Sequence, residues 1–320
     1  MKRLKRAPTA AMSTTRRIGL REKDTVPAAC IVARLSCSVT NACMQTIIRN
    51  AAVTGMRIRA DASEMEVLRM ANAVRFNRKS QNEFSKMFHS LCDRHRNWQV
   101  WSDFITVAAI EIACSIDRTS DDAKSRMSEY KSIMEKYSPD ERAKFADMFA
   151  QIVDGLEANP EQDFLGEMFM GLGLSNHWKG QVFTPYSVCH MIAAISIDAI
   201  ADKAEQNGWA SAVDPCCGAG ALLIALRDEA VQKQIPPTSL LFVGQDIDRV
   251  AALMCFIQLS LLGCAGYVVV GDSISNPVCD MSPLLPAKKP GQEFWITPMS
   301  CDPVWQARRN AARMDQMFKK

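Results

Sequence analysis

Three aspartates in the second half of this 320-residue chain each come within two residues of the end of a short, mainly apolar stretch. They are Asp214, Asp246 and Asp272, and the glycines Gly218 and Gly220 follow the first of them. A carboxylate accepts hydrogen bonds from two ribose hydroxyls or from an amine. Glycine lets the backbone approach a ligand closely and leaves helix N-terminal N–H groups available to it. This set of residues therefore predicts a nucleoside-binding site.

The elements around these residues alternate between helix and strand. The expected order is a helix over 184–206, a strand at 212–213, a helix to about 234, a strand at 240–243, a helix over 248–262 and a strand at 267–270. This β-α-β-α-β order predicts an α/β fold with a parallel sheet covered by helices. Such sheets bind ligands outside the carboxyl ends of their strands, where all three aspartates are expected to meet.

The glycine spacing distinguishes between adenosine cofactors. A dinucleotide site requires Gly-x-Gly-x-x-Gly/Ala, but Leu223 occupies the sixth position, which disfavours a pyrophosphate site. S-adenosylmethionine has no phosphate, and the acidic turn at Asp214 is compatible with its ammonium and sulfonium groups. Asp246, after the second strand, suits the ribose hydroxyls, and Asp272, after the third strand, suits the adenine amine. These residues are therefore compatible with S-adenosylmethionine as the cofactor.

Residues 163–275 resemble the adenine-specific DNA methylases that are the modification subunits of type I restriction–modification systems. Residues 163–169 are similar to the family's helix before the cofactor site, and residues 179–185 to its Gly-x-Phe-Thr-Pro segment. Residues 214–220, Asp-Pro-Cys-Cys-Gly-Ala-Gly, resemble its Asp-Pro-Ala-Cys-Gly-Ser-Gly turn. Residues 244–246 and 271–272 resemble the next two motifs.

The resemblance implies a Rossmann-like class I methyltransferase sheet, complete or incomplete, that acts on a flipped adenine in double-stranded DNA. It implies that Phe183 and Thr184 contact the methionine end of the cofactor. It also implies that the two glycines line the cofactor, that Asp246 holds the ribose and that Asp272 holds the adenine amine. Thr184 is in addition a candidate helix N-cap.

The family's catalytic Asn/Asp/Ser-Pro-Pro-aromatic tetrapeptide has an altered counterpart here. There a side chain and a carbonyl accept hydrogen bonds from the adenine amine, and the aromatic ring stacks on the base. The nearest match is Asp302, Pro303, Val304 and Trp305, after a strand-like stretch at 293–296, with valine in place of the second proline. Residues 276–279 are a weaker candidate without the aromatic. A plain turn is the other interpretation of Asp302 and Pro303.

Two functions follow from these motifs. The first is a DNA adenine-N6 methyltransferase of the restriction–modification type, with Asp302, Pro303 and Trp305 as catalytic candidates. The alternative is a catalytically degenerate module that binds S-adenosylmethionine and assembles with a separate DNA-specificity subunit, because only 15 residues follow Trp305. Methylation of a small molecule or a protein is a third class, which the fold alone does not exclude.

Charge and helical periodicity divide the chain into three expected parts. Residues 1–60 hold 12 Lys and Arg against two acidic residues, a net charge of +10, which leaves −7 for the rest. Residues 1–64 are interpreted as a basic, disordered extension, for which Met65 is a candidate for the true start. A DNA-contacting arm and a targeting leader are the alternatives. The helical periodicity of residues 65–175 predicts a helical domain, with a capping box at 138–141. Residues 176–320 are expected to form the methyltransferase domain.

Other classes of protein lack support in the sequence. None of the 12 cysteines forms a Cys-x-x-Cys pair, and His-Glu-x-x-His and phosphate-loop patterns are absent, so we expect no metal site. Residues 250–270 carry no charge over 21 residues, but glycines and a β-branched run favour a helix followed by a strand over a membrane span. No signal peptide is visible, and we expect a cytoplasmic protein without membrane contact.

Overall fold

The computed structural model describes residues 76–174, 183–278 and 282–318. The first part is helical, as predicted. Its helices are α4 (Lys79–Cys92), α5 (Asn97–Ile116), α6 (Asp121–Met134), α7 (Pro139–Ala158) and α8 (Phe164–Gly171). The predicted capping box is present at the start of α7, where Ser138 and Glu141 exchange hydrogen bonds and Pro139 follows Ser138.

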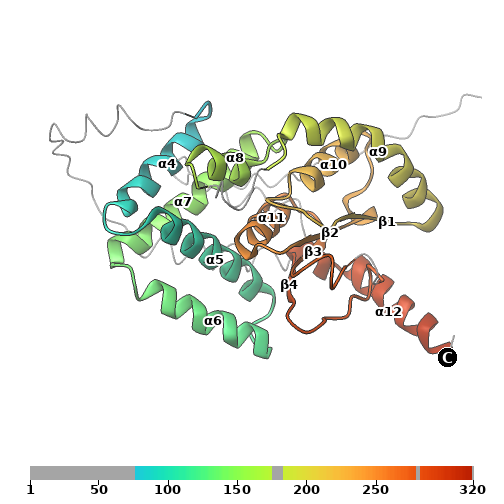
Figure 1. The fold of residues 1–320 in the computed structure, drawn as a ribbon. Coiled ribbons are helices and arrows are strands. Elements are labelled where there is room, and N and C mark those ends of the chain that lie inside the picture. Colours follow the sequence, from blue (N-terminus) through green and yellow to red (C-terminus); the bar gives the residue numbers. More distant parts are fainter. Residues whose placement is uncertain (1–75, 175–182, 279–281, 319–320) are drawn as a thin grey trace, which may run out of the picture.

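The second part is an α/β sheet with its helices, so the predicted fold class is confirmed (Figure 1). Its strands are β1 (Ala210–Asp214), β2 (Leu240–Asp246), β3 (Gly266–Val270) and β4 (Glu293–Ile296), in that spatial order. Its helices are α9 (Tyr186–Asn207), α10 (Ala221–Gln232), α11 (Arg249–Leu261) and α12 (Pro303–Phe318), with short 3-10 turns η2 (Pro237–Ser239) and η3 (Pro298–Cys301). The strands β1, β2 and β3 run parallel.

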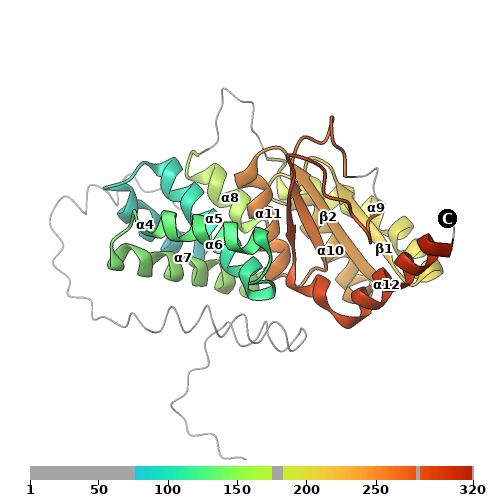
Figure 2. The same ribbon diagram turned by 90° about the horizontal axis from the view of Figure 1, so that it is seen from below.

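The hydrophobic core is continuous from the helical part into the sheet. One cluster of buried side chains runs from Phe84 in α4 through α11 to Trp295 in β4. Figure 2 shows α11 between the helical part and the strands. Residues 250–259 of α11 and all of β3 are buried, so the uncharged stretch at 250–270 is a core helix and a core strand, as predicted. One helix, α5, is long and apolar enough to cross a membrane, but 72% of its apolar window is buried inside the protein.

The fourth strand does not run in the direction that the catalytic prediction required. It pairs antiparallel with β3, with Val270 opposite Glu293 and Tyr267 opposite Ile296. A parallel pair needs a crossover that returns the chain to the same edge, usually through a helix. The described residues between β3 and β4 contain no helix. The chain reverses its direction between β3 and β4, and β4 ends at the amino edge of the parallel strands.

Candidate functional site

The carboxyl edge of the sheet is organised around Asp246, the last residue of β2. Its Oδ2 accepts the Gly218 N–H at 2.8 Å, and its Oδ1 accepts the Asp248 N–H at 2.8 Å. Burial raises the pKa of Asp246, and these backbone hydrogen bonds oppose the rise. A carboxylate has more acceptor positions than these two bonds use, so Asp246 can also accept from a ligand.

The glycine turn after β1 needs its glycines. Gly218 has a φ of +53° and Gly220 a φ of +99°, both in the left-handed region. A Cβ on Gly218 would lie 3.1 Å from the ring of Phe183, and a Cβ on Gly220 would lie 2.9 Å from Sγ of Cys255. Gly220 is the N-cap of α10, so the free N–H groups of the first helical turn start directly after it.

The other two predicted acids lie at the same edge. Asp214 accepts the Cys216 N–H at 3.0 Å, and burial together with the charge of Asp246 raises its pKa. Asp272 accepts the Ile274 N–H at 2.9 Å and the Ser275 hydroxyl at 2.8 Å, which lowers its pKa. Asp272 therefore stays ionised and remains an acceptor.

The loops after β1 and β3 meet above β2. The Sγ of Cys216 and the Oγ of Ser273 are 3.8 Å apart, although 57 residues separate them in the chain. The structure thus brings the three predicted acids and both glycines to one edge, as expected.

Phe183 lies against the glycine turn, while Thr184 is exposed. The Phe183 ring packs on Phe169 of α8 at a centroid distance of 5.2 Å. The prediction that Thr184 caps a helix is wrong. The N-cap of α9 is Pro185, whose carbonyl oxygen accepts the N–H of Cys189, so Thr184 lies one residue too early. Residues 179–182 of the predicted motif lie outside the described residues.

Two exposed isoleucines at this edge were missed by the sequence reasoning. Ile247 follows Asp246 directly and is 74% exposed, and Ile274 lies two residues after Asp272 and is 91% exposed. Apolar side chains beside hydrogen-bond acceptors suit the faces of a flat heterocycle. The available signal was an apolar residue close behind each strand-end acid.

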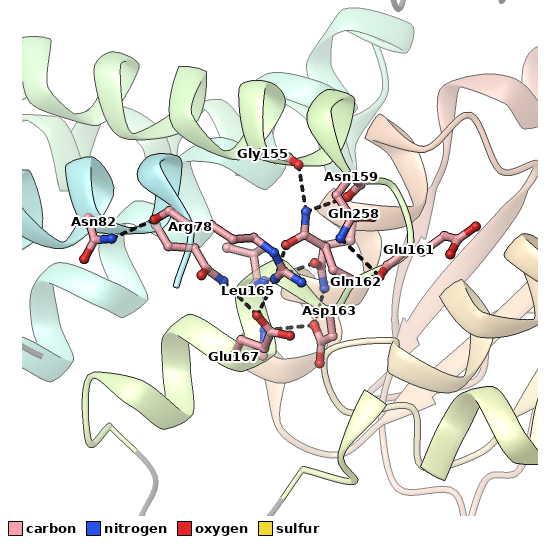
Figure 3. A network of polar contacts seen from close by, with 12 residues as sticks. Arg78, Asn82, Gly155, Asn159, Glu161, Gln162, Asp163, Leu165, Glu167 and Gln258 are labelled. Atoms are coloured by element: carbon pink, nitrogen blue, oxygen red, sulfur yellow. Dashed lines mark hydrogen bonds and ion pairs between the residues drawn. The ribbon is translucent and has the colours of Figure 1, made fainter. Parts of the chain in front are cut away.

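A buried polar network beneath the glycine turn was also missed. Nε2 of Gln258 in α11 donates to Asp163 at 2.8 Å and to the carbonyl oxygen of Ala219 at 2.9 Å. Its Oε1 accepts the N–H of Leu165 at 3.1 Å. Asp163 is the N-cap of α8, accepting the Gly166 N–H, and burial raises its pKa to about 6. Figure 3 shows Gln258 reaching the start of α8.

The same network continues to the first described residues of the chain. Arg78 donates to Gln162 at 2.5 Å and to Glu167 at 2.7 Å (Figure 3). Gln162 in turn donates to the Gly155 carbonyl oxygen of α7. The start of α8 is therefore held both from the helical part and from the sheet part.

The predicted catalytic residues lie at the opposite edge of the sheet. Asp302 follows η3 and accepts the N–H of Val304 at 2.8 Å, and Pro303 begins α12. Trp305 is fully buried and packs edge-to-face on Trp209, the residue before β1, at 6.2 Å. These residues do follow a fourth strand, as predicted, but β4 is antiparallel to β3, so they lie at the amino edge of the parallel strands and not beside the three acids. Asp302 forms the plain turn that was the other interpretation, at the start of a helix.

The weaker tetrapeptide candidate lies nearer to the acids. The N–H of Asn276 donates to the carbonyl oxygen of Asp272 at 3.0 Å. The carbonyl oxygen of Asn276 accepts from Gln245 at 3.0 Å and from Gln292 at 2.9 Å. Val278 is buried, and Cys279 lies outside the described residues. The segment is therefore tied to the sheet as part of the loop after β3.

A family of known proteins matches the part of the chain that contains this edge of the sheet. Residues 162–289 match the family model of N-6 DNA methylases, a range that includes every cofactor-site candidate and ends before Asp302. No curated protein matches the chain. A solved structure from Listeria monocytogenes, named as a "putative class I S-adenosylmethionine-dependent methyltransferase", is similar at 15% identity and a TM-score of 0.34. That similarity covers 62% of this chain and 55% of the Listeria chain, so the match spans about half of that protein. The predicted resemblance to N-6 DNA methylases is thereby confirmed for residues 162–289, which are 128 of the 320.

Proposed function

We propose that this chain is an S-adenosylmethionine-dependent methyltransferase of the N-6 DNA methylase type, which acts on adenine in double-stranded DNA. The observation that carries the proposal is the carboxyl edge of the sheet. There Asp246 holds the glycine turn through Gly218, with Asp214 and Asp272 on either side. The family match over residues 162–289 supports the methyl donor and the nucleic-acid substrate.

The donors and acceptors at this edge fit the chemical groups of S-adenosylmethionine. Asp246 would accept from the ribose hydroxyls and Asp272 from the adenine amine, with Ile247 and Ile274 against the faces of the ring. Asp214 would face the positively charged methionine end. When bound, S-adenosylmethionine supplies an electrophilic methyl group, and the residues of this chain hold and orient it.

The methionine end would also meet Phe183 and Thr184, as the family resemblance implies. Phe183 already packs on Gly218, so its ring closes one side of the glycine turn. Thr184 is exposed next to it and offers a hydroxyl to solvent or ligand.

The adenine-binding part of the site requires more than the predicted tetrapeptide. An adenine amine needs hydrogen-bond acceptors beside the methyl donor, and a flipped base needs a stacking surface. Asp302 and Trp305 are at the amino edge, so they do not supply these groups to a cofactor at the carboxyl edge. We therefore propose that a separate DNA-specificity subunit works with this chain.

A second function is favoured by the position of Asp302 and Trp305 at the amino edge. With Asp302 and Trp305 turned to the amino edge, the chain would act as a cofactor-binding module that transfers no methyl group by itself. Both functions require the same cofactor site, and they differ only in the chemistry at the base.

Calorimetric titration with S-adenosylmethionine tests the cofactor site. Wild type should bind one equivalent, and Asp246→Ala should weaken binding at least tenfold, because the ribose loses its acceptor. Asp202→Ala, which removes an exposed aspartate on α9, is the matched control and should bind as wild type does. Absence of binding to the wild type would refute the proposed site.

A transfer assay then separates the two functions. Labelled S-adenosylmethionine is incubated with DNA of mixed sequence, with and without candidate specificity subunits, and the products are examined for N6-methyladenine. Incorporation that Asp246→Ala abolishes supports the methyltransferase. Cofactor binding without incorporation under any of these conditions supports the binding module.

A further inference from the structure

A cavity of about 1050 Å³ lies at the amino edge of the sheet, away from the proposed cofactor site. It is bounded by the end of α7, the second half of α10, the end of α11 and the first residues of β2. The cofactor candidates are not among its lining residues. The cavity is therefore a separate feature of the fold, and its interpretation does not depend on the proposed function.

The wall of the cavity is mainly apolar, and α7, α10, α11 and β2 each contribute side chains to it. Its apolar lining residues include Leu156, Val231, Leu240, Phe242, Leu261 and Met299. Small-molecule sites have this character, with volumes of about 300–1,000 Å³ and a few polar groups that fix orientation. The volume of this cavity is large enough for an elongated organic molecule.

The charged residues of the cavity are predominantly acidic. In the described part of the chain, its charged lining residues are Asp154, Glu157 and Asp302 together with one cation, Arg227. The Arg227 guanidinium is already paired with the fully buried carboxylate of Asp228 at 2.8 Å. An entering molecule therefore meets three carboxylates and a neutralised guanidinium, which favours a positively charged ligand.

Glu157 has an unused hydrogen-bond acceptor. Its Oε1 is buried and has no hydrogen-bond partner among the described residues. Burial and the nearby charge of Asp154 both raise the pKa of Glu157. Glu157 itself lines the cavity and is partly exposed, so an ammonium that enters can pair with its carboxylate at one side of the apolar wall.

We propose that this cavity binds an apolar amine, a small molecule whose ammonium pairs with Glu157 and whose apolar body fills the space between α7, α10 and β2. The apolar wall selects the body of the ligand, and the carboxylates select the sign of its head group. An anion of the same length would meet three like charges and be rejected.

The test uses the full-length chain and three probes that differ only in their head group. Decylammonium, decanol and decanoate are titrated below their micellar concentrations and followed by calorimetry. Decylammonium should bind saturably at one site and at least tenfold more tightly than decanoate. Glu157→Gln keeps the side-chain shape but removes its charge, and should weaken decylammonium binding about tenfold while leaving decanol binding unchanged.

A second variant tests the location independently of Glu157. Val231→Trp places an indole in the cavity from a half-exposed position, where the larger side chain can be accommodated, and should abolish binding of decylammonium. Glu161→Gln, an exposed acid outside the lining, is the control and should bind as wild type does. Melting curves establish that each variant is folded.

Three results would overturn the proposal. They are no saturable binding of decylammonium, equal binding of all three probes, and decylammonium binding that survives Val231→Trp.

Discussion

The side-chain amide of Gln258 donates to the carboxylate of Asp163, 95 residues earlier in the chain, at 2.8 Å. The same nitrogen donates to the carbonyl oxygen of Ala219 inside the glycine turn at 2.9 Å. Gln258 is fully buried, so neither acceptor can exchange this donor for water. The first turn of α8 and the proposed cofactor turn are thus fixed by one side chain.

Replacing Gln258 should affect both stability and cofactor binding. Gln258→Ala removes the donor to two buried acceptors and leaves a void, so we expect a loss of about 3 kcal/mol in the free energy of unfolding. S-adenosylmethionine affinity should fall because the Ala219 carbonyl is no longer held. Urea denaturation and calorimetry measure the two effects. The exposed Gln206→Ala should change neither, and a folded Gln258→Ala with unchanged stability would contradict the role of the network.

The buried Asp163 predicts a specific pH dependence of stability. Its pKa is about 6 in the folded chain against an ordinary value of 3.8, because burial disfavours the ionised form. The folded chain therefore holds this proton to higher pH than the unfolded chain does. Its contribution to the free energy of unfolding is full below about pH 4 and is lost as pH rises through about 6. The loss amounts to about 2–3 kcal/mol.

Asp163→Asn isolates this effect. The amide oxygen can still accept from Gln258 and Gly166, but it carries no charge, so the variant should be more stable than wild type at pH 8 and not at pH 4. Chemical denaturation at both pH values measures the difference. Other buried carboxyls with raised pKa, such as Asp214 and Asp228, titrate in both proteins and cancel in the comparison. Equal pH profiles for the two proteins would rule out the raised pKa.

Gly220 should tolerate no side chain. Gly220→Ala combines a left-handed backbone with a Cβ only 2.9 Å from Sγ of Cys255, and we expect about 3 kcal/mol of destabilisation. Gly208→Ala is the matched control, since its φ is +75° but the space around it is open. It should cost about 1 kcal/mol and leave cofactor affinity unchanged. Thermal melts of both variants measure the difference, and equal costs would show that the contact with Cys255 is relaxed.

Trp305 and Asp302 should behave as structural residues. Trp305→Ala removes a fully buried indole from a hydrophobic cluster that includes Leu241 and Tyr267, so we expect a loss of about 3–5 kcal/mol. Asp302→Ala removes one capping acceptor at the start of α12 and should cost about 1 kcal/mol. Asp302→Ala should bind S-adenosylmethionine as wild type does. A selective loss of methyl transfer in Asp302→Ala, at unchanged stability, would restore the catalytic interpretation.

Local spacing in the sequence was sufficient to predict which residues lie at the carboxyl edge of the sheet. An apolar run followed by an acid indicates a strand end, and two glycines behind it indicate a tight strand-to-helix turn. Parallel strands place their carboxyl ends at one edge, so the positions of Asp214, Asp246 and Asp272 followed from element order alone. The capping box before α7 is a similarly local signal.

Only the tertiary structure decided the direction of β4 and the partners of Gln258. A strand of four residues pairs equally well in either direction by its own pattern, and the direction depends on how the preceding chain returns to the sheet. Likewise, nothing near Gln258 in the sequence shows that Asp163 will be its neighbour. Contacts between residues far apart in the chain depend on the packing of whole elements, which residue spacing along the chain does not encode.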